Sequence, residues 1–254
     1  MAIRSSDKSR ILSKMNGVSF NFDFTLDPQV FDMFLGFYEL DIRNTLLRFL
    51  RKGSVFIDIG ANIGFISALG AGLVGKSGEV HSFEPVPYYF RRLSDMAKMN
   101  NDYQIFVNNF ALGEKYEKID INITNYENIG WNTMVPGMMR ANTIKETIKV
   151  DVKRIDDYIL ENEINNISLI KIDVEGFEFP VLKGLTKFFE ECRRSLPPIV
   201  VEIAYSAYPN LGVKLGDLED FIRSYSYEIY SINGKHKVDI KTFEITTDVI
   251  LIHS

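Results

Sequence analysis

One stretch of the chain constrains the fold more than any other, and it reads Ser54-Val-Phe-Ile-Asp-Ile-Gly-Ala-Asn-Ile-Gly-Phe-Ile-Ser67. Its first part, residues 55–59, is apolar apart from Asp58 and rich in β-branched residues, which predicts a strand buried on both faces of a parallel sheet. The run breaks at Gly60, and apolar residues continue beyond it at helical spacing. A strand, a glycine turn and a helix predict an open α/β sheet, which binds ligands where its strands end.

Polar residues around this turn favour a nucleoside cofactor. Gly60 and Gly64 allow the backbone to approach a bound molecule where a Cβ would collide. Asp58 is a carboxylate at the end of the strand. Glu84 ends the next predicted strand, residues 79–84, where an acidic side chain can accept hydrogen bonds from ribose hydroxyls.

Two nucleoside cofactors fit this geometry. A dinucleotide site prefers G-x-G-x-x-G, whose second glycine lets the backbone approach the pyrophosphate. This chain has Asn62 at that position, in a shorter G-x-N-x-G form. S-adenosylmethionine has no phosphate and carries a sulfonium cation, so it tolerates Asn62 and benefits from nearby carboxylates. It is the predicted cofactor, and a plain strand-to-helix turn with packing glycines is the alternative.

Composition and charge exclude several classes of protein. With 254 residues, 46% of them hydrophobic, the chain can bury a large core. A formal charge of −5 without a basic tract argues against a nucleic-acid binder. Cys192 is the only cysteine and the three histidines are scattered, so neither a disulfide nor a histidine or cysteine metal site is expected. No apolar run could span a bilayer and residues 1–13 lack a signal-peptide core, so we expect a cytoplasmic protein.

The chain divides at the start of an amphipathic helix. We expect an N-terminal extension over residues 1–36, frayed through residue 13, with a short strand outside the main sheet at residues 20–26. The main domain follows over residues 37–254. Glu39 lies near the start of its first helix, either as a favourable charge on the helix dipole or as a carboxylate facing the cofactor's ammonium group.

A strand pair interrupts the parallel core. Residues 118–123 and 148–152 alternate apolar and polar side chains, which predicts inserted antiparallel strands. The loop at residues 126–141 has no regular pattern, and loops of such length are usually functional or disordered. Its candidates for lining a substrate cleft are Trp131, Asn132 and Thr133.

The most polar strand ending in the chain is Lys171-Ile-Asp-Val-Glu-Gly176. Alternation puts Lys171 and Asp173 on the same side of the strand, Glu175 follows in the turn, and Glu202 lies on a third buried strand. A lysine inside an apolar strand needs an acidic partner, which is Asp173 or Glu202. These four residues are the candidate catalytic groups: the carboxylates could hold a cation, accept a proton from an acceptor, or bind a Mg²⁺-type ion. We rank direct carboxylate catalysis first.

Four motifs carry a family resemblance: residues 55–64, Phe83-Glu-Pro85, Asn109-Phe-Ala-Leu-Gly113 and residues 170–178. In their order and spacing the chain resembles FkbM-type S-adenosylmethionine-dependent methyltransferases, from about residue 37 to residue 202. The resemblance implies the Rossmann-like class I methyltransferase fold: a mostly parallel sheet of seven strands in the order 3-2-1-4-5-7-6, with strand 7 antiparallel and helices on both faces. It also implies O-methylation, most often of sugar hydroxyls in glycans or in secondary metabolites.

The resemblance also implies residue roles. The candidate cofactor contacts are Glu39, Asp58, Gly60, Asn62, Gly64, Phe65, Glu84, Asn109 and Asp173. The chain departs from the family where it reads Glu202-Ile-Ala204, since such proteins often have Glu-Ile-His there, so a histidine base is absent. Tyr205 and Tyr208 could stack on a sugar face. An NAD-dependent oxidoreductase and a non-catalytic binding protein on the same fold are the alternative functions.

Overall fold

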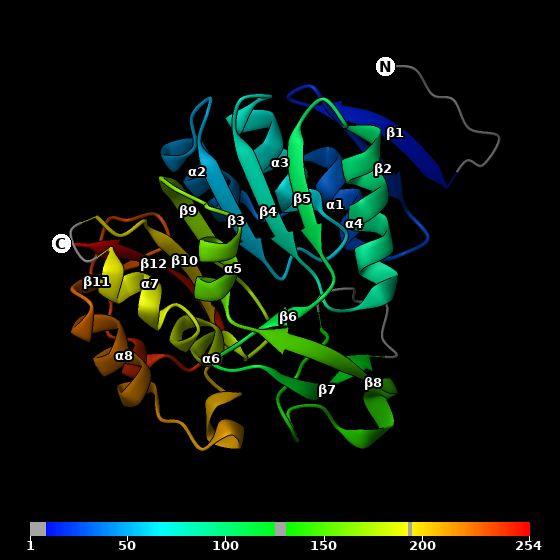
Figure 1. Cartoon of the computed structure of the whole chain (residues 1–254). Coiled ribbons are helices and arrows are strands. Elements are labelled where there is room, and N and C mark those ends of the chain that lie inside the picture. The colour runs from blue at the N-terminus through cyan, green and yellow to red at the C-terminus, as the bar shows by residue number, and fades with distance from the viewer. Residues whose placement is uncertain (1–8, 125–130, 193–194) are drawn as a thin grey trace.

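The computed structural model describes residues 9–124, 131–192 and 195–254 (Figure 1). A seven-stranded sheet forms its centre. The strands of this main sheet are β3 (Val55–Ile59), β4 (Glu79–Phe83), β5 (Gln104–Asn108), β9 (Ile167–Ile172), β10 (Ile199–Ile203), β11 (Tyr227–Ser231) and β12 (Thr247–His253).

The strands of the main sheet lie in the order β5-β4-β3-β9-β10-β12-β11. Numbered along the chain, this is the predicted order 3-2-1-4-5-7-6. β12 is antiparallel to both of its neighbours, whereas β5, β4, β3, β9 and β10 run parallel. These five strands therefore end at one edge of the sheet, which we call the carboxyl edge, and the predicted fold class is confirmed.

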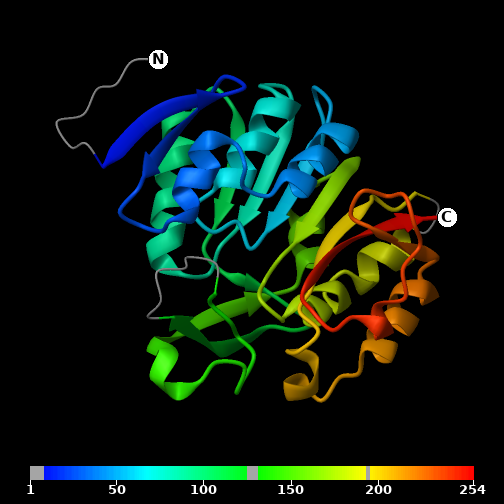
Figure 2. The ribbon, with the colours of Figure 1, turned by 180° about the vertical axis from the view of Figure 1, so that it is seen from behind.

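Helices cover both faces of the sheet. Figures 1 and 2 show α5 on one face and α2 and α3 on the other. The helices are α1 (Gln29–Leu35), α2 (Leu40–Phe49), α3 (Phe65–Val74), α4 (Pro87–Met99), α5 (Ile155–Glu161), α6 (Glu178–Lys183), α7 (Thr186–Glu191) and α8 (Leu215–Ser224), with short 3-10 turns at Ala141–Thr143, Tyr208–Leu211 and Ile240–Thr242. Among the described residues, no helix is long and apolar enough to cross a membrane.

The N-terminal segment packs onto α3. Strands β1 (Arg10–Met15) and β2 (Val18–Asp23) form an antiparallel hairpin outside the main sheet, as predicted for β2. Phe20 and Phe22 of β2 lie edge-to-face against Phe65 of α3. The expected fraying through residue 13 is wrong for residues 10–13, because each of them pairs with a residue of β2. Residues 1–8 lie outside the described part.

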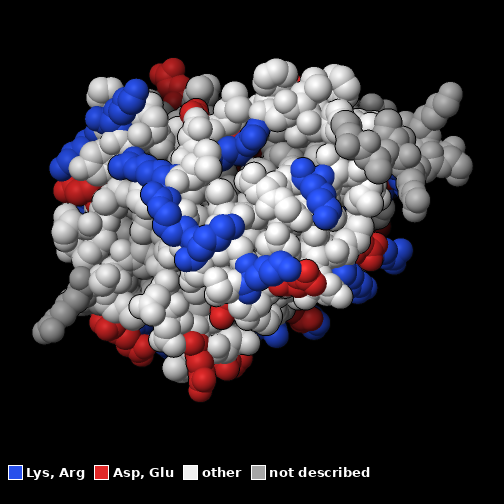
Figure 3. All heavy atoms as spheres, turned by 90° about the horizontal axis from the view of Figure 1, so that it is seen from above, with Lys and Arg blue, Asp and Glu red and all other residues white. Residues whose placement is uncertain are grey.

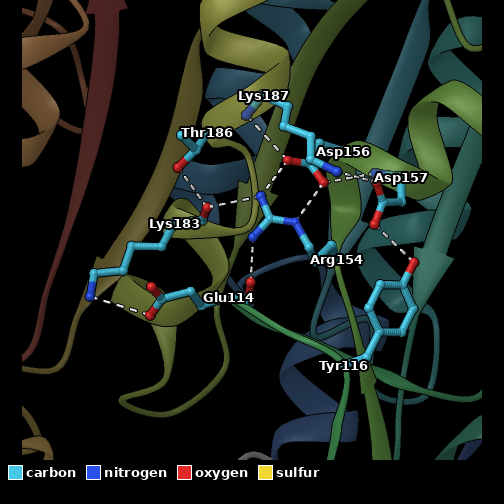
Figure 4. Close-up of polar contacts among 8 residues, drawn as sticks. All are labelled: Glu114, Tyr116, Arg154, Asp156, Asp157, Lys183, Thr186 and Lys187. Carbon is cyan, nitrogen blue, oxygen red and sulfur yellow. Dashed lines mark hydrogen bonds and ion pairs between the residues drawn. The ribbon is translucent and has the colours of Figure 1, made fainter.

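The predicted strand insertion is confirmed. β7 (Glu117–Thr124) and β8 (Ile144–Lys153) pair antiparallel, and the short β6 (Ala111–Leu112) adds a parallel strand to β8. Figure 1 shows this second sheet lying beyond the carboxyl edge of the main sheet. Arg154 joins it to the helices, because its guanidinium donates to the Asp156 carboxylate and to the backbone oxygens of Glu114 and Lys183 (Figure 4). These contacts connect the second sheet to α5 and to the end of α6.

Candidate active site

A cavity of about 230 Å³ opens at the carboxyl edge, where β3, β4, β9 and β10 end. Residues from distant parts of the chain meet on its wall because parallel strands end there together. The predicted site residues on this wall are Glu39, Gly60, Asn62, Phe65, Glu84, Trp131, Asn132, Lys171, Asp173, Glu175 and Glu202.

The glycine turn and Glu84 hold each other in place. Gly60 and Asn62 both have left-handed backbone conformations, with φ of 78° and 51°. The amide nitrogen of Asn62 donates to Glu84 Oε2 at 2.9 Å, and that of Val86 donates to Oε1 at 2.8 Å. Burial raises the pKa of Glu84 to about 7. A carboxylate has roughly four acceptor positions, so Glu84 keeps acceptor capacity for a ligand in the cavity.

Three predicted cofactor contacts lie off the cavity wall. A Cβ on Gly64 would come within 2.8 Å of a leucine side chain of α4, so this glycine allows helix packing. Asp58 is fully buried and accepts a hydrogen bond from Ser67 Oγ at 2.5 Å. The amide of Asn109 donates to the backbone oxygen of Glu84 at 2.9 Å. In the structure all three have supporting positions, and their direct contact with a cofactor stays a prediction.

Lys171 is neutralised within the protein. Its Nζ lies 3.0 Å from Asp173 Oδ2, 3.6 Å from Asp58 Oδ1 and 3.2 Å from the backbone oxygen of Gly60. Burial opposes the charge on Lys171, but the two carboxylates outweigh burial and raise its pKa. Asp173 is therefore the partner, and the alternative prediction that Glu202 neutralises Lys171 is wrong. In this structure the Lys171 ammonium group is a counter-ion to Asp173 and Asp58, and its catalytic role stays a prediction.

Three carboxylates converge beside Lys171. Ligand oxygens of Asp173, Glu175 and Glu202 lie within 4.8 Å of one another, and no other group of this kind occurs in the described part of the chain. Burial and the charge of Asp173 raise the pKa of both Glu175 and Glu202. Glu202 Oε2 is buried without a hydrogen-bond partner among the described residues. Asp248 of β12 pairs opposite Glu202, and burial raises its pKa to about 7. A cation would stabilise this cluster.

The turn that presents Glu175 is held by a residue to which the sequence gave no role. Glu175 and Gly176 have positive φ of 53° and 101°. The buried Glu178 accepts from the Gly176 amide at 2.8 Å through Oε1 and from the Tyr208 hydroxyl at 3.2 Å through Oε2. Glu178 lies within the 170–178 motif, two residues after Gly176, and this position is the sequence feature from which its role could have been predicted.

The predicted substrate contacts divide into two groups. Trp131 is 56% exposed and lies on the cavity wall beside Asn132. Thr133 is buried, and its Oγ1 donates to the Glu175 backbone oxygen at 2.6 Å, so it supports the turn. The prediction that Tyr208 stacks on a sugar is wrong, because its side chain is fully buried and bound to Glu178. Tyr205 is half-buried and lies off the wall.

The wall also contains aromatic residues that the sequence did not single out. Tyr38 packs edge-on against Phe65, with ring centroids 5.7 Å apart. Burial and the charges of Glu39 and Asp173 raise its pKa. Tyr89 of α4 lies on the same wall. Tyr38 precedes Glu39 directly, and this position was the only sequence signal for it.

Residues 58–229 match the family model of the methyltransferase FkbM domain, which is more than half of the chain. The chain belongs to the FkbM family of S-adenosylmethionine-dependent methyltransferases. The family model begins at Asp58 and includes the glycine turn, Glu84 and the acidic cluster. Of the cavity-wall residues discussed above, only Tyr38 and Glu39 precede it.

Two relatives within curated proteins are similar to this FkbM-family chain. "Methyltransferase 1" of Beauveria bassiana is 26% identical over 148 residues, which are 52% of this chain and 58% of the relative. "Hexuronic acid methyltransferase AglP" of Haloferax volcanii is 26% identical over 181 residues, 70% of this chain and 67% of the relative. The chain thus spans less than two thirds of the fungal relative. Among solved structures, an O-methyltransferase from Thermotoga maritima is 10% identical, with a TM-score of 0.46 over 85% of this chain and 65% of that one.

Proposed function

We propose that this FkbM-family chain is an S-adenosylmethionine-dependent O-methyltransferase whose acceptor is a sugar hydroxyl in a glycan or secondary metabolite. The observation that carries the proposal is that several carboxylates at the carboxyl edge line one cavity together with the glycine turn. The name of the haloarchaeal relative, a hexuronic acid methyltransferase, supports a sugar acceptor.

The residues on the wall suit S-adenosylmethionine. Glu84 retains acceptor positions for ribose hydroxyls, while Val86 and Phe110 offer apolar surface for a base. Burial and the charge of Asp173 raise the pKa of Glu39, so added positive charge on this side of the cavity would favour its carboxylate form. A sulfonium and an ammonium group would supply that charge.

The chain's own part in the reaction is to position and deprotonate the acceptor. When bound, the cofactor supplies an activated methyl group that passes to an oxygen nucleophile as the carbon–sulfur bond breaks. The wall must hold the acceptor oxygen in line, which can contribute several kcal/mol. Glu175 is our candidate for the group that takes the hydroxyl proton, because Glu178 and Thr133 hold its turn in place. The pKa of Glu175 is raised, and the sulfonium cation of a bound cofactor would lower it.

The exposed ring of Trp131 suits a sugar acceptor. It lies on the cavity wall, and 56% of the residue's surface is exposed. Aromatic side chains offer a large apolar face at little conformational cost. We propose that Trp131 and Asn132 contact the acceptor at the rim.

Magnesium assistance is the second-ranked mechanism. Asp173, Glu175 and Glu202 offer the oxygen ligands that such an ion prefers. Turnover that is unchanged by EDTA and by added Mg²⁺ supports direct carboxylate catalysis. Loss of turnover in EDTA that Mg²⁺ restores supports the metal.

The proposed function is tested by following the methyl group. The protein is mixed with S-adenosylmethionine labelled in its methyl group and with a panel of glycosides, and the products are separated and identified by mass spectrometry. We expect label in a methyl ether of a glycoside. Binding of S-adenosylmethionine without transfer to any acceptor points to the non-catalytic alternative, and retention of NAD in its place points to an oxidoreductase.

A further inference from the structure

The amino-acid end of the proposed cofactor carries a carboxylate as well as its two cationic groups. In the proposed function, acidic side chains of the cavity wall suit the sulfonium and the ammonium group. The carboxylate of the same amino acid needs hydrogen-bond donors, because a carboxylate that leaves water without them costs free energy. The ammonium group of Lys171 lies on the wall, but it already binds Asp173, Asp58 and the backbone oxygen of Gly60.

Two uncharged side chains on the wall keep donors for a ligand. Gln29 and Tyr38 line the cavity, and neither side chain makes a hydrogen bond to another residue in the described part of the chain. Asn62 and Asn132 of the same wall are engaged, since Asn62 Oδ1 accepts from a backbone amide and Asn132 binds the Tyr89 hydroxyl. The hydroxyl of a tyrosine that packs against the core usually has a partner. A ligand is therefore the expected partner of the Tyr38 hydroxyl.

Several contacts hold Tyr38 at the corner between α1 and α2. Its backbone amide donates to the Asp32 oxygen at 3.3 Å, and its ring lies edge-on to Phe65 with centroids 5.7 Å apart. Glu39 follows in a left-handed conformation, with φ of 51°, and its backbone oxygen accepts from the amide of Arg43 at 2.9 Å. Non-glycine residues keep this conformation only where surrounding contacts hold it. The corner thus places Tyr38 and Glu39 together on the cavity wall.

We infer, on the basis of the proposed cofactor site, that the Tyr38 hydroxyl donates a hydrogen bond to the carboxylate of the cofactor's amino acid, beside Glu39. The carboxylate and the ammonium group of an amino acid are bonded to one carbon, so the side chains that bind them must be neighbours. Glu39 is the proposed partner of the ammonium group and follows Tyr38 directly, which favours Tyr38 over Gln29. All three residues precede the segment that matches the family model.

The Tyr38 phenol keeps its proton at neutral pH. Burial and the charges of Glu39 and Asp173 raise its pKa, and Lys171 opposes this shift without reversing it. A protonated phenol donates to a carboxylate and brings no charge to the wall. Tyr38 therefore acts as a donor to the cofactor and not as a base.

The test compares two ligands that differ by this carboxylate. S-adenosylmethionine and its decarboxylated form are titrated by calorimetry into wild-type protein and into Tyr38→Phe. We expect Tyr38→Phe to weaken binding of S-adenosylmethionine by about tenfold and to change binding of the decarboxylated form by less than about twofold. An equal loss for both ligands, or an unchanged affinity for S-adenosylmethionine, overturns the inference.

Tyr103→Phe is the matched control, because Tyr103 is also half-buried and packs against the core but does not line the cavity. We expect it to bind both ligands as the wild type does. The wild type alone provides a second measurement that needs no variant to fold: it should bind S-adenosylmethionine more tightly than the decarboxylated form. Equal affinity of the wild type for the two ligands overturns the inference.

Binding also separates the role of Tyr38 from the proposed function. If S-adenosylmethionine binding depends on Tyr38 but no glycoside is methylated, the proposed reaction fails and the hydrogen bond stands. If a glycoside is methylated but Tyr38→Phe loses no affinity, only the hydrogen bond fails. A wild type that binds neither ligand overturns both the cofactor site and the hydrogen bond.

Discussion

In the proposed function, individual carboxylates at the carboxyl edge have separable tasks. Glu84 is fixed by two backbone amides beside the proposed ribose site, whereas Glu175 lies in a turn on the proposed acceptor side. Asp173 lies between them and neutralises Lys171. Substitutions that keep the size of each side chain should therefore affect cofactor affinity and turnover differently.

Glu84→Gln should weaken S-adenosylmethionine binding by about tenfold or more, because a hydrogen bond to a charged group contributes about 1.5–3 kcal/mol. Titration calorimetry measures this loss, and the thermal midpoint shows whether the variant is folded. Glu79→Gln is the matched control, since Glu79 lies at the other end of β4 and pairs with His81. Unchanged affinity in folded Glu84→Gln would contradict the ribose assignment.

Glu175→Gln should mainly lower kcat, because the amide cannot accept the acceptor's proton. Asp173→Asn should mainly weaken cofactor binding, since it removes a negative charge from the part of the site that is proposed to bind the cationic groups of the cofactor. Steady-state kinetics with both substrates varied separates the two effects. Full turnover in Glu175→Gln would show that this residue is not the base.

The role of a residue could be predicted only where the sequence indicates both its side chain and the residues that lie near it in space. The carboxylates at strand ends were found because a parallel sheet brings strand ends together. The role of Tyr208 was predicted wrongly, because the sequence shows an aromatic residue in a loop but does not show that its side chain is buried against Glu178. The partner of Lys171 was left open because Asp173 and Glu202 were equally plausible from strand register alone.

At the scale of elements, the turn from Asp173 to α6 is the part on which the proposed catalysis depends. It contains two residues with positive φ, and Glu178 and Thr133 both bind its backbone. Left-handed conformations of non-glycine residues cost free energy and persist only where surrounding contacts hold them. The turn should therefore be sensitive to changes in residues that never touch a ligand.

Tyr208→Phe should destabilise the protein by about 1 kcal/mol and also lower turnover, because it removes the hydroxyl that binds Glu178. Urea unfolding and steady-state kinetics measure the two effects. Tyr227→Phe is the matched control, since its buried hydroxyl donates to the Pro197 oxygen at 2.7 Å, away from the cavity wall. We expect a similar loss of stability there with normal turnover. Equal turnover in both variants would contradict the positioning role of the turn.

Elements were predicted better than their contacts. Apolar runs and glycine turns located the strands of the main sheet, and alternation located β7 and β8. The pairing of β1 with β2 was missed, because the register of a hairpin depends on packing against α3 as well as on local pattern. The position of Arg154 between the insertion and the helices likewise depends on tertiary contacts.

At the scale of the whole molecule, charge is unevenly distributed. Figure 3 views the face over the amino ends of the main strands and shows Lys and Arg side chains gathered there. The acidic cluster lies at the opposite end of the same strands. A cleft lined by one sign of charge attracts ligands of the other sign, so this polarity favours entry of a cation at the carboxyl edge.

The buried carboxyl groups should make stability fall as pH rises. The pKa of Glu84 is raised to about 7 from an ordinary 4.5, so between these values the folded state retains a proton that the unfolded state has lost. Each pKa unit corresponds to about 1.4 kcal/mol. Urea unfolding from pH 5 to pH 8 should therefore show a smaller decline in Glu84→Gln than in wild type. Identical declines would contradict the pKa shift at Glu84.

The central claim is that carboxylates at the carboxyl edge bind the sulfonium cation of S-adenosylmethionine. Calorimetric titration in two buffers of different ionisation enthalpy counts the protons released on binding. S-adenosylhomocysteine has the same amino and carboxyl groups but a neutral sulfur, so the difference between the two ligands isolates the sulfonium. We predict tighter binding and greater proton release for S-adenosylmethionine, because its cation ionises carboxyl groups whose pKa is raised. Equal affinity and equal proton release for the two ligands would contradict the account.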